Sequence, residues 1–163
     1  RNFNYHLKMI EMKNNMVTMN YSFELDCNEK YLFKIMTNYK NLTKYLPRKL
    51  QNLEILEENE DSTTINVTIF LRTLIKKEFS QKLKIKKKSE NTLFVEILDG
   101  HAKGTHITMS LSTKNEKTLC SVNSDVKLSL KTIILLPILK AEYNTFVFSV
   151  FKKMNEDVKE MEV

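Results

Sequence analysis

The sequence predicts an α+β domain in which a curved, seven-stranded antiparallel sheet wraps around one long C-terminal helix, with two short helices after the first strand. Residues 131–163 carry apolar side chains at helical spacing, and the first half of this run is apolar around most of its girth. Residues 50–128 alternate between apolar and polar side chains, the period of half-buried strands. No helical crossover interrupts these strands, so they are expected to be antiparallel.

The long helix is expected to begin near residue 135 or 136, because Pro137 is tolerated in a first turn but disrupts a helix interior. Residues 132–134 then form an apolar connector, which we interpret as a gate that faces residues 99–104 or Pro47. One helix face carries apolar residues in steps of three or four: Leu135, Leu139, Tyr143, Phe146, Val150, Met154, Val158 and Met161.

Seven strands and two short helices are expected before this helix. Asp26 followed by Glu29 has the form of a capping box and predicts a helix start, and the second short helix, 42–45, ends before Pro47. Polar breaks of about five residues between the later strands indicate hairpins. The expected strands are 17–25, 50–56, 63–71, 75–86, 92–98, 105–112 and 118–128.

Both glycines of the chain, Gly100 and Gly104, lie in one predicted loop. They are expected to supply positive φ angles or a bulge where the strand must bend.

Length and composition predict a single domain at 16–163, preceded by residues 1–15 as an extension that is either frayed or packed. Residues 1–15 lack the features of a signal peptide. Cys27 and Cys120 have no ligand or CxxC spacing, so free thiols in a reducing cytoplasm are expected. No pattern indicates a metal or cofactor, and the oligomeric state stays open.

The net charge of +6 is concentrated in residues 72–88, which hold eight basic residues and one acid. Alternation predicts that the lysines of this stretch lie on an exposed edge or outer face. They could instead form a basic platform for anionic membrane headgroups or for RNA phosphates, as in a ribosome-associated protein. The candidate basic residues are Lys76, Lys82, Lys84 and Lys86.

Two short runs resemble a known group of proteins. Residues 38–47, NYKNLTKYLP, and residues 77–83, KEFSQKL, are similar to motifs of the polyketide cyclase and coenzyme-Q-binding group within the START/Bet v 1-like helix-grip superfamily (SRPBCC). The resemblance implies a helix-grip fold with an elongated apolar cavity between sheet and terminal helix. It also implies that the domain binds or carries a lipid, sterol, quinone or polyketide; fold alone does not decide between carrier and enzyme.

The cavity lining is expected from inward-facing positions of the strands and the helix stripe, where Gln81, Ser124 and Tyr143 would orient a polar head group. An alternative is that these residues simply fill a core. The candidate ligand-binding residues are Val67, Ile69, Phe79, Gln81, Leu83, Val122, Ser124, Leu139, Tyr143, Phe146 and Val150.

A cyclase or dehydratase-like enzyme is the second interpretation, with His101 and His106 beside the two-glycine loop as weak candidates for a general base. The first interpretation remains sequestration or transfer of a small hydrophobic ligand. A basic module that binds RNA or the ribosome is the third.

Overall fold

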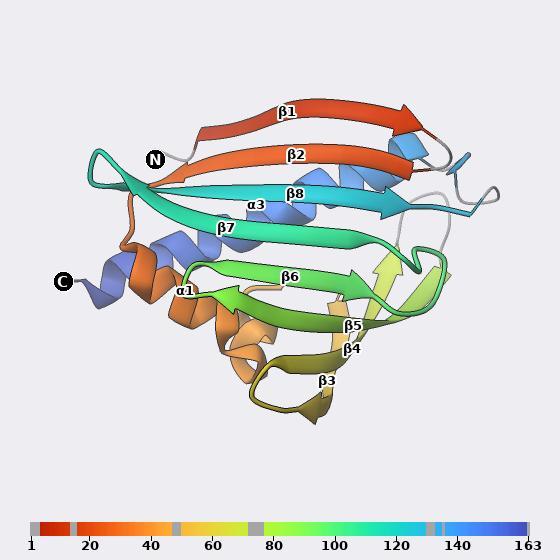
Figure 1. Cartoon of the computed structure of the whole chain (residues 1–163), viewed down its shortest axis with the longest axis horizontal. Helices are drawn as coiled ribbons and strands as arrows, with labels where there is room; N and C mark the ends of the chain where they lie inside the picture. The colour runs from red at the N-terminus through yellow and green to blue at the C-terminus, as the bar shows by residue number, and fades with distance from the viewer. Residues whose placement is uncertain are drawn as a thin grey trace.

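The computed structural model describes residues 4–13, 16–46, 50–71, 77–129, 133–134 and 136–162. Within them, one antiparallel sheet has the strand order β1-β2-β8-β7-β6-β5-β4-β3. The long helix α3 runs along one face of this curved sheet, and α1 packs near its C-terminal half (Figure 1). The elements in chain order are β1 Asn4–Lys13, β2 Met16–Leu25, α1 Glu29–Thr37, the 3-10 helix η1 Tyr39–Lys44, β3 Leu50–Glu58, β4 Ser62–Leu71, β5 Lys77–Ser89, β6 Thr92–Ile97, β7 His106–Lys114, β8 Lys117–Lys127 and α3 Leu136–Met161.

The seven predicted strands are all present, and β1 adds an eighth at one edge. β1 pairs with β2 from Asn4 opposite Glu24 to Lys13 opposite Met16. The N-terminal extension was expected to be either frayed or packed, and residues 4–13 are packed against the sheet. The sequence showed little alternation there, and the pairing with β2 is a tertiary contact.

The prediction for the start of α3 is confirmed, because the helix begins at Leu136 and places Pro137 in its first turn. Ile133 has helical backbone, and its N–H donates to the carbonyl of Ser129 at 3.0 Å, two residues after β8 ends. Pro47 and residues 130–132 lie outside the described residues. Among those described, no helix is long and apolar enough to span a bilayer.

The predicted cap of α1 is wrong by two residues. Asn28, not Asp26, is the N-cap, and its side chain accepts from the N–H groups of Lys30 and Tyr31. The Asp26 carboxylate is occupied elsewhere, by donors from α3. Donors from α3, which are distant in the sequence but close in space, thus bind the Asp26 carboxylate in place of the local capping interaction.

Two connections are shorter than predicted. β5 continues to Ser89, so only Glu90 and Asn91 separate it from β6. β7 and β8 are joined by Asn115 and Glu116, whose φ angles of 52° and 65° form a two-residue hairpin turn. The prediction for the glycines is confirmed, with φ of 77° at Gly100 and 90° at Gly104.

Candidate functional site

Several apolar side chains in the middle of the sheet face α3 and yet keep accessible surface. Val95 on β6 is buried, whereas its partner Ile107 on β7 is only half-buried. A filled core would bury a central strand at least as well as its neighbour. Two half-buried residues of α3 belong to the same set, and together we call them the accessible inner surface: Leu83, Ile107, Met109 and Val126 of the sheet, with Tyr143 and Phe146 of α3.

A pair of hydroxyl groups lies beside this surface and joins the sheet to the helix. Ser124 Oγ on β8 and Tyr143 Oη on α3 are 2.8 Å apart, and Ser124 is fully buried. We call them the hydroxyl pair. Ser124 pairs with Ile107 in the β-ladder, so the pair lies directly next to the accessible inner surface.

A second buried link runs parallel to it. Tyr21 Oη on β2 donates to Asn144 Oδ1 at 2.6 Å, and the rings of Tyr21 and Tyr143 lie 5.4 Å apart. Tyr21 stands on the inward face of β2, where its hydroxyl requires a polar partner. Two consecutive residues of α3 thus hold the helix to two adjacent strands.

Burial raises the pKa of Tyr143 to about 12, although the hydrogen bond with Ser124 lowers it in part. The phenol therefore stays protonated at neutral pH. A neutral hydroxyl in a largely apolar interior can donate a hydrogen bond to a carbonyl oxygen or accept one from a hydroxyl.

The third predicted head-group residue, Gln81, lies on the same inner face but in another place. It is directly opposite Val67, and a Cβ at Gly100 would lie 3.3 Å from Gln81 Cγ. The ladder row through Ser124 crosses β5 at Ile85 instead. Three strand spacings of about 4.8 Å also separate β8 from β5. The structure therefore brings Ser124 and Tyr143 together and leaves Gln81 near the two-glycine turn.

The other predicted lining residues fall into three groups. Leu83 and Phe146 belong to the accessible inner surface. Ile69 and Phe79 pair through their backbones, but their side chains and that of Leu139 lie outside what the structure describes. The buried residues that form the adjoining core are Val67, Val122 and Val150.

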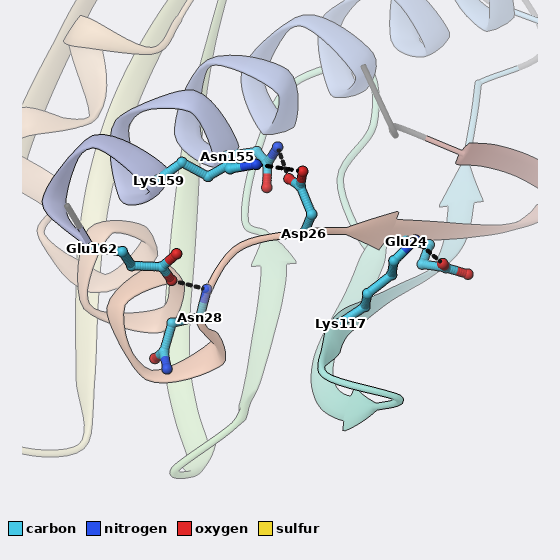
Figure 2. A network of polar contacts seen from close by, with 7 residues as sticks. All are labelled: Glu24, Asp26, Asn28, Lys117, Asn155, Lys159 and Glu162. Carbon is cyan, nitrogen blue, oxygen red and sulfur yellow. Dashed lines mark hydrogen bonds and ion pairs between the residues drawn. The ribbon is translucent and has the colours of Figure 1, made fainter.

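The C-terminal half of α3 is held by polar contacts to the segment after β2. Asp26 accepts hydrogen bonds from Asn155 Nδ2 at 2.9 Å and Lys159 Nζ at 2.6 Å, and Glu162 accepts one from the N–H of Asn28 (Figure 2). These contacts leave α3 anchored at its C-terminal end, away from the connector.

Asp26→Asn is expected to lower the free energy of unfolding at pH 7 by about 1–2 kcal/mol. Burial alone would raise the pKa of Asp26, but the hydrogen bonds from Lys159 and Asn155 outweigh it and lower the pKa. Because the folded-state pKa of Asp26 is lowered, its carboxylate contributes its full stabilisation at pH values above the unfolded-state pKa of about 3.9. This stabilisation is lost as the pH falls through the folded-state pKa. Urea unfolding at pH 7 and at low pH should therefore show the difference between variant and wild type narrowing in acid; a constant difference would contradict this.

Neither candidate histidine faces the hydroxyl pair. His106 stands on the outer face of β7, where its Nε2 lies 3.3 Å from Glu96 Oε2. His101 is exposed in the turn before β7. Both positions argue against a general base acting on a ligand held inside. The alternation of β7 indicates that His106 faces outward, because Ile107 and His106 must point to opposite faces.

The lysines of β5 lie on the outer face of an internal strand, as their alternation with Leu83 and Ile85 predicts. Two acids share this outer face with them: Glu54 lies two strands away in the row of Lys82, and Glu96 is directly opposite Lys84. Lys86 faces Phe94, and Lys76 is outside the described residues. Mixed charge makes this column a poor platform for phosphates.

Sequence reasoning missed two members of the interior links, Tyr21 and Asn144. The inward phase of Tyr21 on β2 was visible, but nothing in the sequence paired it with a helix residue. In the sequence Asn144 is a polar residue within an apolar run, and no pattern gives it a partner.

Neither a family model nor a curated protein sequence matches this chain. Solved structures match in fold. The Zhui aromatase/cyclase from Streptomyces superposes with a TM-score of 0.77 at 8% identity, covering 91% of this chain and 96% of that one. A START superfamily protein from Mycobacterium smegmatis gives 0.69 at 13% identity, covering 88% and 98%. The major latex-like protein 151 from Panax ginseng gives 0.68 at 12% identity, covering 89% and 99%.

The curved sheet around helix α3 and these superpositions show that this chain has the helix-grip fold of the aromatase/cyclase and the START superfamily protein. The resemblance inferred from residues 38–47 and 77–83 is thus confirmed at the level of the fold. Sequence identities this low establish the fold only, so any ligand must be inferred from the residues of the site.

Proposed function

We propose that this protein binds and carries a small hydrophobic ligand in the cytoplasm, between the sheet and the first half of α3. One observation carries the proposal: inward-facing residues of the central strand β7, Ile107 and Met109, keep accessible surface although they face the helix. Apolar surface left accessible inside a fold favours an apolar occupant, because burying it is worth about 25 cal/mol per Å².

The hydroxyl pair defines the polar part of the ligand. Ser124 and Tyr143 offer neutral donors and acceptors and no charge, which suits a carbonyl or hydroxyl group on an otherwise apolar molecule. Fatty acyl, quinone and polyketide-like compounds all share this chemistry. The fold of the neighbours, two of which are named as an aromatase/cyclase and a START superfamily protein, supports the same class.

The direct test is native mass spectrometry of the purified protein, followed by organic extraction of what is released. We expect a bound apolar compound, or saturable binding of a fluorescent fatty acid or quinone by protein stripped of ligand. Protein that is purified empty and binds none of these probes would overturn the proposal.

Tyr143→Phe is expected to weaken binding of a carbonyl-bearing probe about tenfold, the loss of one hydrogen bond of about 1.4 kcal/mol. Binding of a hydrocarbon probe without polar groups should stay nearly unchanged. Tyr31→Phe, at an exposed tyrosine of α1, is the matched control. Equal effects on both probes would contradict a head-group role for the hydroxyl pair. Fluorescence titration of both probes provides the comparison.

A cyclase on this fold remains the second candidate, supported by the protonated Tyr143, which could polarise a carbonyl. It requires a base that reaches the interior, and His101 and His106 are placed on the outside. Incubation with a linear polyketide mimic decides between the two: unchanged mimic supports a carrier, and a cyclised product supports an enzyme. His106→Ala that abolished such turnover would restore the histidine as its base.

A further inference from the structure

One end of the molecule collects several chain segments and is distinct from the end that anchors α3. Lys13 pairs with Met16 and Met16 with Lys127, so the ends of β1 and β8 and the start of β2 meet there. The turn 98–105 lies at the same end, as does the beginning of α3 (right-hand side of Figure 1). We call it the connector end: the turn 98–105 with residues 127–129 and 133–134.

Two exposed lysines, Lys103 and Lys127, belong to the connector end. The side chain of Lys127 lies along Gly104, since a Cβ there would be 3.2 Å from Lys127 Cδ, and Gly104 follows Lys103 in the turn. Within the described part of the chain neither lysine forms an ion pair. An acid of this end, Asp99, accepts from the N–H of Lys82 instead.

At the opposite end of the molecule, lysines form ion pairs with acidic side chains. Ion pairs join Lys44 to Asp157, Lys117 to Glu24 and Lys159 to Asp26 there. Asp99 keeps its negative charge, so the connector end carries two lysines against one carboxylate, a small positive excess that favours an anionic partner.

An exposed apolar residue projects from the same place. Ile134 is 79% exposed, the largest value among the exposed large hydrophobic residues of the described chain. The Ile133–Ser129 hydrogen bond holds this segment close to the end of β8. Leaving an isoleucine in water rather than burying it costs about 1.5–3 kcal/mol.

We propose that the connector end docks on an anionic lipid bilayer. Lys103 and Lys127 contact lipid phosphates, while Ile134 enters the boundary between headgroups and acyl chains. The combination favours a bilayer over single-stranded RNA, because an aliphatic side chain offers no ring for base stacking. The proposal assigns membrane contact to this end and not to the mixed-charge column of β5, and it goes beyond ligand binding.

The chain contains no tryptophan, so Ile134→Trp introduces a single reporter at the proposed insertion point. We expect its emission to shift to shorter wavelength with vesicles of phosphatidylglycerol and phosphatidylcholine, and not with phosphatidylcholine alone. Leu56→Trp is the matched control, because Leu56 is 45% exposed on β3, the edge strand on the other side of the sheet from β1 and β2. No shift at position 134, or an equal shift at position 56, would overturn the proposal.

Cosedimentation of the otherwise unchanged protein with the same vesicles tests the lysines. Lys103→Gln with Lys127→Gln is expected to weaken binding about tenfold to thirtyfold, at about 1 kcal/mol for each lysine. Lys84→Gln with Lys86→Gln, on the outer face of β5, should change it less than about threefold. Equal losses in the two double variants, or release of the protein from vesicles by RNA, would refute this docking surface. The Lys103 and Lys127 double variant should still bind a fluorescent fatty acid in vesicle-free solution, which separates docking from ligand binding.

Discussion

Phe151→Ala is expected to lower the free energy of unfolding by about 3–5 kcal/mol, the usual loss when a buried phenylalanine is truncated. Phe151 lies on the inward face of α3 and is 6% exposed. Its ring stacks on Phe23 with the ring centres 5.2 Å apart, and Phe23 is fully buried. The truncation therefore removes contacts at the main junction between helix and sheet.

Phe148→Ala, on the same helix at a residue that is 40% exposed, is the control for Phe151→Ala. It should cost less than about 1 kcal/mol, since little area is lost from the interior. Urea unfolding monitored by circular dichroism measures both, with similar slopes required for the comparison. Similar losses in the two variants would show that the stacked Phe151 ring contributes no more to stability than an exposed ring of the same helix.

Ile107→Phe is expected to abolish ligand binding, with a loss of at least about a hundredfold, and to leave the free energy of unfolding within about 1 kcal/mol of the wild type. Ile107 faces α3 from the central strand β7 and keeps accessible surface beside Ser124. A larger side chain there would occupy space available to a ligand. In a filled core the same change would cost about 1–3 kcal/mol through overpacking.

Leu111→Phe, four residues along the same inward face of β7, is the matched comparison because Leu111 is 1% exposed. It should lose about 1–3 kcal/mol of stability and keep its ligand affinity. Titration with a fluorescent fatty acid, together with urea unfolding, measures both properties. Equal destabilisation by the two substitutions would mean that the interior is filled, in which case the carrier function fails.

Part of the candidate site followed from periodicity. The alternation of β8 placed Ser124 among inward-facing residues, and the spacing on α3 placed Tyr143 on the helix face toward the sheet. Their hydrogen bond could not be predicted, because it depends on how far α3 slides along β8. The hydrogen bond between Tyr21 and Asn144 could not be predicted for the same reason.

The expectation that Asp26 caps α1 failed for a similar reason. Asp26 had the local form of a helix cap, but Asn155 and Lys159, far away in the sequence, supply stronger donors to its carboxylate. Gln81 shares the inner face with Ser124, yet strand order and register separate the two. Alternation identifies a face of a sheet, and a face is much larger than a site.

The sequence by itself determined the elements whose causes are local. Pro137 set the start of α3, the two glycines supplied the positive φ angles of one turn, and the period of two assigned inner and outer faces. Tertiary structure alone decided which residues of those faces meet: the pairing of β1 with β2, the hydroxyl pair, and the Lys127 side chain along Gly104. The physical reason is that local sequence restricts backbone angles within a few residues, whereas strand order and helix placement are set by burial summed over the whole domain.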